Sequence, residues 1–229
     1  MATFQAQVEG LTSLGTLSGS TTPTLDELSQ FLKDGVIDVT NKTLSTSPKD
    51  ILDFTTVSSE ATANDSLDIN GSLIVSVVRE SGTNNDWRDC KLIPPGMVGQ
   101  VTDTDSLFYA SKHNPVYTIL DNGIVNVYPA PDTGGADSFK VYYVNNVPKD
   151  KSGAVLIYSH SDIKYFADDK VYLVVLYAAI KSIEAKIAFY AVEEEDTELV
   201  QAYQLNLQTL QNQYNSAFLQ PKQRSKDEG

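Results

Sequence analysis

The stretch from Asp168 to Gln220 constrains the fold of this chain more than any other part of the sequence. Its first part, residues 171–180, is apolar on every side, which is typical of a helix buried among other helices. Further along, bulky apolar residues recur at steps of three or four, the period of a helix: Leu199, Tyr203, Leu207, Leu210, Tyr214 and Phe218. We therefore expect two long C-terminal helices, divided near the acidic run at 193–196.

The opposite face of the last predicted helix is polar but carries no charge. Its residues are Gln201, Gln204, Asn206, Gln208, Gln211, Asn212 and Asn215, whereas a solvated helix face usually carries Lys and Glu. Two interpretations stay open. The helices form a hairpin that closes a monomeric core, or the amides pack against a neighbouring copy, where they can be satisfied without desolvating charge. The second interpretation predicts a subunit interface at Gln201, Gln204, Gln208 and Gln211.

Length and net charge limit which kinds of protein this chain can be. A chain of 229 residues with 41% hydrophobic residues can bury a core. The formal net charge of −13 argues against a protein that grips nucleic acid, because grip needs clustered Lys and Arg. The longest apolar run, 171–180, is shorter than the roughly 18 to 20 residues of a membrane span, and the first residues lack a signal-peptide pattern. We expect a protein made in the cytoplasm with no membrane partner.

The N-terminal region predicts an arm followed by one helix. Residues 1–21 are rich in Gly, Ser and Thr, which indicates a flexible, extended arm. Thr24 and Glu27 have the spacing of a capping box, and apolar residues at helical steps follow them. Gly35 costs about 1 kcal/mol relative to alanine within a helix, so we expect a kink or an end there.

From residue 51 to about residue 148 the pattern changes from helical to alternating. The strand candidates are 51–58, 66–70, 72–80, 87–93, 116–120, 124–128 and 139–144. Turn-forming residues separate them, most clearly Asp121-Asn122-Gly123.

This order of elements predicts an α+β fold. A helical bundle, made of the N-terminal helix and two C-terminal helices, would carry an inserted antiparallel β-sandwich or barrel. The predicted parts are a flexible arm, 1–21, a discontinuous helical domain, 22–48 and 160–220, an inserted β domain, 49–159, and a flexible tail, 221–229.

Few residues could support catalysis or metal binding. His113 and His160 lie beside turn residues and fit no catalytic motif. Cys90 stands in an alternating segment, where a thiol is usually packed and inert. We predict that the protein is not an enzyme and has no catalytic, cofactor-binding or metal-binding residues. Aromatic residues of the β region are expected mostly in its core, and an exposed platform for sugar or protein is the alternative.

Several segments resemble the head-to-tail adaptor, or connector, proteins of tailed bacteriophages. They are the pattern LxxFLxxG in the first helix, the strand ending in Val127-Tyr128-Pro129-Ala130-Pro131, the segment FKVYYVNNVP, and the helix continued by EEEDTELV. The similarity is one of order and composition, and it spans about two-thirds of the chain.

The resemblance implies a structural virion protein of the phage neck or tail. Typically about twelve copies form a ring below the portal protein, extend the DNA channel and support a tail or nozzle protein. DNA would pass without sequence-specific binding. The resemblance also implies that the C-terminal tail docks on the portal, through Pro221, Lys222, Arg224 and Lys226. From charge alone we expect the channel lining to include Glu193, Glu194, Glu195 and Asp196, since carboxylates repel phosphates. A solvated acidic bend is the alternative for this run.

A second function stays open, an oligomeric binding module or tail fibre-type protein. Its β domain would bind a ligand through exposed aromatics, and its helices would form an oligomerisation stem. A trimeric stem needs a long apolar seam flanked by charged residues, and the last predicted helix lacks those charges. The mass of the native particle separates the two functions, because a fibre is trimeric and an adaptor ring is larger.

Overall fold

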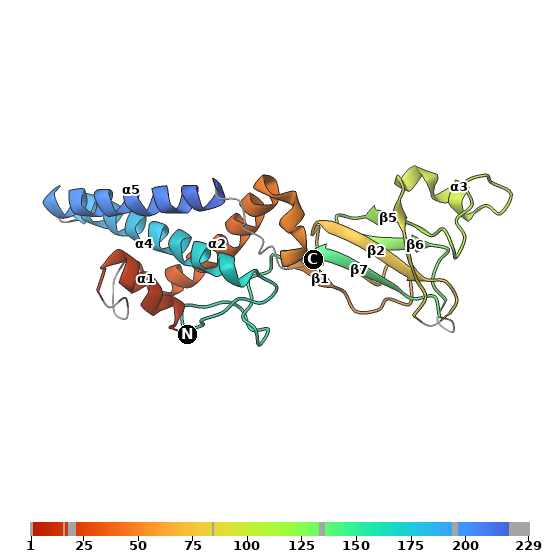
Figure 1. Ribbon diagram of the computed structural model, residues 1–229, viewed down its shortest axis with the longest axis horizontal. Helices are drawn as coiled ribbons and strands as arrows, with labels where there is room; N and C mark the ends of the chain where they lie inside the picture. The colour runs from red at the N-terminus through yellow and green to blue at the C-terminus, as the bar shows by residue number, and fades with distance from the viewer. Residues whose placement is uncertain are drawn as a thin grey trace, which may run out of the picture. The chain divides into compact units, whose positions relative to one another are not determined.

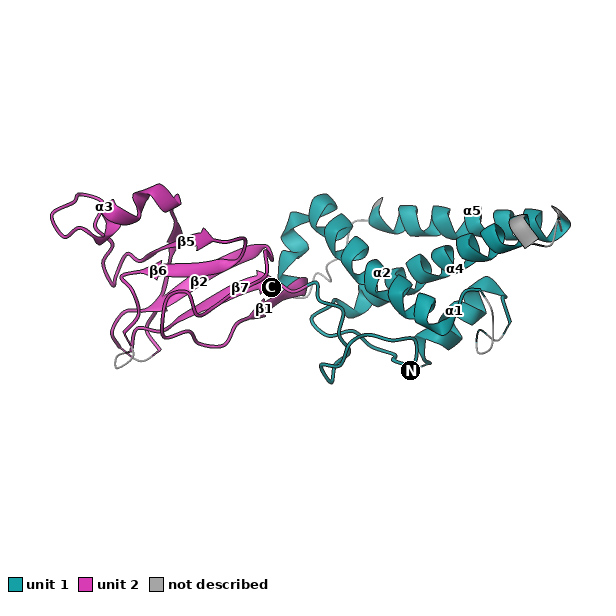
Figure 2. Ribbon diagram, turned by 180° about the vertical axis from the view of Figure 1, so that it is seen from behind, with its two compact units in different colours: residues 1–53, 146–229 teal, residues 54–145 magenta. Residues whose placement is uncertain are grey.

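The computed structural model describes residues 2–15, 17, 22–83, 85–132, 136–193 and 197–219. The chain divides into two compact units (Figure 2): a helical unit, 1–53 with 146–229, and an inserted β unit, 54–145. The protein therefore has an α+β fold. The observed insertion is shorter than the predicted one, because residues 49–53 and 146–159 group with the helices.

The helical unit is built around α4 (Val171–Glu193). Three helices pack on it (Figure 1): α1 (Phe4–Thr12), α2 (Leu25–Thr46) and α5 (Thr197–Leu219). A short 3-10 helix, η3 (Asp168–Lys170), leads into α4, and η1 (Pro48–Phe54) follows α2. Most of the apolar run that begins α4 is buried, together with Ile183 in the next turn. Its buried residues are Leu173, Val174, Val175, Leu176, Ala178, Ala179 and Ile180.

The start of α2 is the predicted capping box. The side-chain hydroxyl of Thr24 accepts a hydrogen bond from the Glu27 backbone N–H at 3.2 Å, and the Glu27 carboxylate accepts one from the Thr24 backbone N–H at 2.7 Å. These two bonds satisfy N–H groups that a helix start otherwise leaves unpaired.

Of the kink or end expected at Gly35, the end is wrong, because α2 runs without interruption to Thr46. Gly35 is buried against α4. A β-carbon at position 35 would lie 3.1 Å from Cδ1 of Tyr177 and 3.3 Å from the carbonyl oxygen of Val174. The glycine thus permits a close approach of two helices and does not mark a break.

The prediction of an extended arm over residues 1–21 is wrong for Phe4–Thr12, which forms α1. Thr3 caps this helix, and Phe4, Val8 and Thr12 form its buried stripe at steps of four. The backbone N–H of Phe4 also donates to the carbonyl oxygen of His160 at 2.8 Å. Packing on α4 stabilises this short helix, which the Gly, Ser and Thr content of residues 1–21 as a whole does not predict.

The β unit is a sandwich of two sheets. One sheet is antiparallel, with the strand order β1 (Thr55–Val57), β7 (Phe139–Val144), β2 (Ile74–Glu80), β3 (Trp87–Asp89). The other has the order β4 (Lys91–Leu92), β5 (Val116–Leu120), β6 (Ile124–Tyr128), in which β4 pairs parallel to β5 and β5 pairs antiparallel to β6. Both sheets contribute to one core, which includes Val77, Tyr117, Val125, Val127, Phe139 and Val141.

Strands β5, β6 and β7 have the predicted bounds, but other segments differ. The predicted strand 87–93 divides at Cys90 into β3 and β4, which belong to different sheets. Segment 66–70 forms only an isolated bridge, Asp68 with Ile124. Nearby, the side-chain amide of Asn64 donates to the carbonyl oxygen of Val127 at 3.0 Å and accepts from its N–H at 2.9 Å. A side chain thus takes the place of a neighbouring strand at this part of β6.

The segment between β4 and β5, two neighbouring strands of the same sheet, adds a short helical element at one end of the β unit. It consists of η2 (Pro95–Met97) and α3 (Val98–Thr102), followed by the loop 103–110 (Figure 1). Val101 and Ala110 anchor it in a small core with Ile93 and Val116.

Replacing Gly35 with alanine should lower the free energy of unfolding by about 1 to 2 kcal/mol, because crowding against α4 outweighs the gain in helix propensity of about 1 kcal/mol. Urea denaturation followed by circular dichroism measures this change. Gly10→Ala in α1 is the matched control, since a β-carbon there meets nothing within 4 Å. The control should gain stability, and an equal gain for Gly35→Ala would contradict the close helix approach.

Candidate functional site

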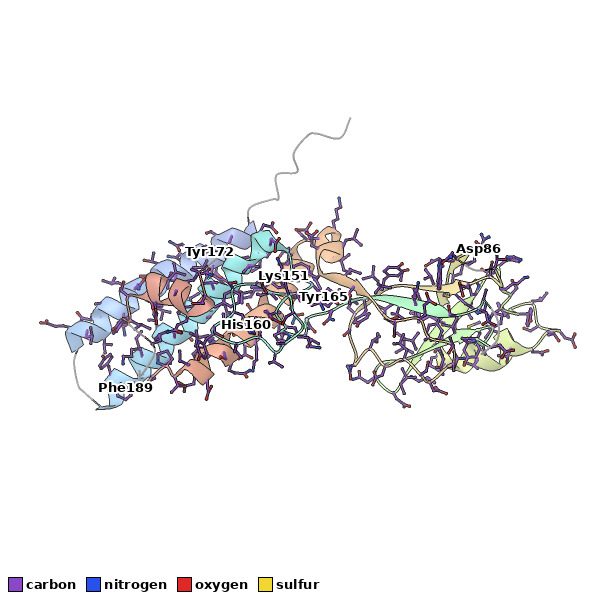
Figure 3. All side chains as sticks on the ribbon, turned by 90° about the horizontal axis from the view of Figure 1, so that it is seen from below. Asp86, Lys151, His160, Tyr165, Tyr172 and Phe189 are labelled. Atoms are coloured by element: carbon purple, nitrogen blue, oxygen red, sulfur yellow. The ribbon has the colours of Figure 1, made fainter. Side chains whose placement is uncertain are left out.

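The predicted apolar stripe of α5 packs on α4. Leu210 and Tyr214 are buried, and the rings of Tyr203 and Tyr190 stack with centroids 6.0 Å apart. Figure 3 labels Tyr172 and Phe189 near the two ends of α4. The ring of Phe189 contacts that of Tyr190 edge-on within α4, at 5.7 Å. The stacking of Tyr203 on Tyr190 and the burial of Leu210 and Tyr214 therefore fix which side of α5 faces inward.

A polar contact between α5 and α2 fixes the same orientation. The Tyr214 hydroxyl donates to Oδ2 of Asp38 at 2.5 Å, and Nζ of Lys42 lies 2.9 Å from the same oxygen. Lys42 Nζ also lies 4.6 Å from the centroid of the Tyr214 ring. Burial, with the hydrogen bond to Asp38 as a further cause, raises the pKa of Tyr214 far above its ordinary value.

With that side buried, the outer side of α5 presents a long surface without charge. We call it the uncharged face, and its exposed residues are Gln201, Ala202, Gln204, Leu205, Gln208, Thr209, Asn212, Gln213, Asn215 and Ser216. Leu205 is 68% exposed in the middle of these polar side chains. Together with Gln201, Gln204 and Gln208 it lines an open surface pocket of about 330 Å³.

The structure brings together three of the four predicted interface residues. Gln201, Gln204 and Gln208 are exposed around one pocket. Gln211 is half-buried, and its side-chain nitrogen lies 3.5 Å from Oε1 of Glu184 on α4. It therefore belongs to the contact between α4 and α5. The sequence prediction did not include Leu205. Its position, two residues from both Tyr203 and Leu207, places it outside the buried stripe, and this spacing was the available signal.

The other predicted site residues lie where the structure gives no side-chain detail. Glu193 is the last residue of α4, and its side chain is outside the described part of the chain. Glu194, Glu195 and Asp196 are outside the described residues, as are Pro221, Lys222, Arg224 and Lys226. Channel lining and portal docking stay predictions.

Titratable groups in the described residues are dispersed. They include no group of three or more His, Cys, Asp or Glu placed to hold a metal ion. His160, labelled in Figure 3, lies 3.9 Å from Asp150 within the connection that precedes α4. Cys90 is buried, and burial, with the nearby Asp89 carboxylate, raises the pKa of its thiol to about 12. None of the described helices is sufficiently long and apolar to cross a bilayer.

The aromatic residues of the β unit divide between core and surface. Tyr117 and Phe139 are buried, and Trp87 is covered by Lys140, whose Nζ lies 4.2 Å from the ring centroid. Phe108 and Tyr109, by contrast, are neighbours in an exposed loop. The sequence indicates this exposed pair only weakly: two aromatic residues follow Leu107 directly after a turn.

Comparison with known proteins adds no family to this description. No protein-family model matches the sequence, and no curated protein matches it.

Cys90 should be unreactive toward iodoacetamide in the native protein at pH 8, because its raised pKa keeps the thiol protonated and burial blocks access. Alkylation followed by mass spectrometry should be slower than in the urea-unfolded chain by about a hundredfold or more. Equal rates would show that the β core opens readily around this residue.

Tyr214→Phe should lower the free energy of unfolding at neutral pH by about 1 to 2 kcal/mol, because the hydrogen bond to Asp38 is lost. The raised pKa of Tyr214 stabilises the fold fully below its unfolded pKa of 10.0, and this contribution is lost as the pH rises above that value. Urea midpoints between pH 8 and pH 11 should therefore fall less steeply in the variant. The control Tyr172→Phe, at a half-exposed tyrosine of α4, should keep the wild-type slope.

Proposed function

We propose that this protein is a head-to-tail adaptor of a tailed bacteriophage. It would form a ring below the portal protein, line the DNA channel and join the head to the tail. The order of elements in the resemblance supports this, as does an α+β fold in which helices carry an inserted β unit.

The uncharged face of α5 is the observation that carries the proposal. Between Gln201 and Ser216 the chain has no charged residue, although its formal net charge is −13. Copies that carry this excess charge repel each other, and the repulsion is weakest where neither surface contributes charge. Interface cores are depleted in Lys, Glu and Asp for the related reason that charge is costly to desolvate.

A ring follows from such a surface if it meets a different surface of the next copy. A contact of this head-to-tail type repeats around an axis and closes when the rotation allows. Leu205 would supply an apolar centre for the contact, and the amides of Gln201, Gln204 and Gln208 would hydrogen-bond around it.

The remaining roles in this proposal belong to segments near the helix ends. Glu193, Glu194, Glu195 and Asp196 would line the channel, so that DNA slides past without sequence-specific binding. The tail from Pro221 onward, with Lys222, Arg224 and Lys226, would dock on the portal protein.

The second candidate, an oligomeric binding module or fibre-type protein, has one observation in its favour. Phe108 and Tyr109 are exposed on the β unit, where a ligand could reach them. Native mass spectrometry and negative-stain electron microscopy separate the candidates. A trimer supports the fibre, and a ring of about 300 kDa, twelve copies of the 25.0 kDa chain, supports the adaptor.

Changing Gln204 and Gln208 together to lysine should abolish rings, because two added charges would be buried at each contact. The fold should keep its stability to within about 0.5 kcal/mol, since both residues are exposed. The matched control is Asn41→Lys with Ser45→Lys, which adds the same charge at the same spacing on exposed positions of α2. Rings of normal size from the Gln204/Gln208 variant would refute this interface.

A further inference from the structure

The dipeptide Asn-Gly occurs twice in the chain, as Asn70-Gly71 and as Asn122-Gly123. An asparagine followed by glycine is prone to lose its side-chain amide, because no β-carbon shields the backbone nitrogen of the glycine. As sequences the two sites are equivalent. The structure places them at different positions of their turns, and the difference concerns the nitrogen atom that has to react.

Asn70 and Gly71 are the two central residues of a tight turn. Their φ angles are 51° and 70°, and the N–H of Ser72 closes the turn by donating to the carbonyl oxygen of Ile69 at 3.0 Å. This closing bond does not use the Gly71 N–H, which makes no hydrogen bond to any described residue. Both Asn70 and Gly71 are exposed, so the Gly71 nitrogen is accessible and unpaired within the described part of the chain.

Asn122 and Gly123 sit one position later in the hairpin turn between β5 and β6. The central residues of that turn are Asp121 and Asn122, with φ angles of 43° and 62°. The N–H of Gly123 therefore closes the turn, by donating to the carbonyl oxygen of Leu120 at 2.9 Å, and Gly123 is buried. The nitrogen that would have to react at this site is both hydrogen-bonded and shielded from water.

We propose that Asn70 is a site of spontaneous deamidation in the folded protein, that Asn122 is protected from it, and that the product weakens the β unit. The Gly71 backbone nitrogen loses its proton and attacks Cγ of Asn70. A bond forms between that nitrogen and Cγ, the bond from Cγ to the side-chain nitrogen breaks, and ammonia leaves with the proton. Water then opens the cyclic imide at one of its two carbonyls, which leaves aspartate or isoaspartate at position 70.

The turn at Asn70 is held loosely enough for this step. The side chain of Asn70 has to rotate toward the Gly71 nitrogen, and it makes no hydrogen bond to a described residue. The backbone N–H of Asn70 donates to Oδ1 of Asp68 at 2.7 Å. An exposed turn with so few bonds opens locally at small cost.

The product disturbs a segment that packs closely on the β5–β6 hairpin. Ile69 is buried in the core of the β unit, and its N–H donates to the carbonyl oxygen of Gly123 at 3.1 Å. A β-carbon at Gly71 would lie 3.1 Å from Nδ2 of Asn122. Isoaspartate adds one methylene to the main chain between these two contacts, and close packing leaves no room for it. The proposal goes beyond the adaptor function, because it depends on neither a ring nor the uncharged face of α5.

Peptide mass spectrometry tests the selectivity in the full chain, incubated at pH 8 in water enriched in heavy oxygen. Newly formed aspartate and isoaspartate then carry the label. In the native protein Asn70 should react at least about ten-fold faster than Asn122, the factor expected when one N–H is freed from a hydrogen bond. The guanidinium-unfolded chain is the control, because both sites lose their turns there and should react at similar rates. Equal rates in the native protein, or no label at Asn70, would overturn the proposal.

A matched variant then separates the added charge from the lengthened main chain. Asn70→Asp carries the new carboxylate on an ordinary backbone, and aspartate tolerates the left-handed conformation. The aged wild-type fraction that gains one negative charge, isolated by anion exchange, contains isoaspartate and should unfold at a lower temperature than Asn70→Asp in scanning calorimetry. Equal unfolding temperatures would overturn the proposed weakening of the β unit. Neither result bears on ring formation, so the adaptor function is tested separately.

Discussion

Burial of α4 is the interaction on which the rest of the helical unit depends. Each large apolar side chain that is fully buried contributes about 1.5 to 3 kcal/mol, and α4 buries Leu173, Val174, Leu176 and Ile183 almost completely. The helices α1, α2 and α5 each pack on it. Since an isolated helix is marginally stable in water, the short α1 in particular needs this contact to form.

The same packing determines which surface of α5 stays exposed to solvent. Tyr214 is held by Asp38 on α2 and by the aromatic side chains around it, so α5 cannot rotate without losing these contacts. Its uncharged face is thereby fixed outward. An uncharged surface on a strongly acidic chain is the feature on which the proposed assembly rests, because association there would cost the least desolvation of charge.

In the β unit, too, the packing of the core determines which surface stays exposed. Its core closes between two sheets, and the divergence of β4 from β5 at Pro94 leaves a hollow near one end of the short sheet. The loop after α3 exposes Leu107 and Phe108. The unit thus has apolar surface beyond what its own core buries.

The sequence by itself determined the α+β class, the capping box at Thr24, the bounds of β5, β6 and β7, and the lack of charge on the uncharged face of α5, since each is a local property of neighbouring residues. Only the tertiary structure decided the rest. It turned Gln211 onto Glu184 while leaving Gln204 exposed, made Gly35 a close helix contact, and folded residues 4–12 into a helix. It also placed β3 and β4 in different sheets and left Phe108 in solvent. The physical reason is that burial depends on which distant segment arrives to cover a side chain, and no local pattern records that partner.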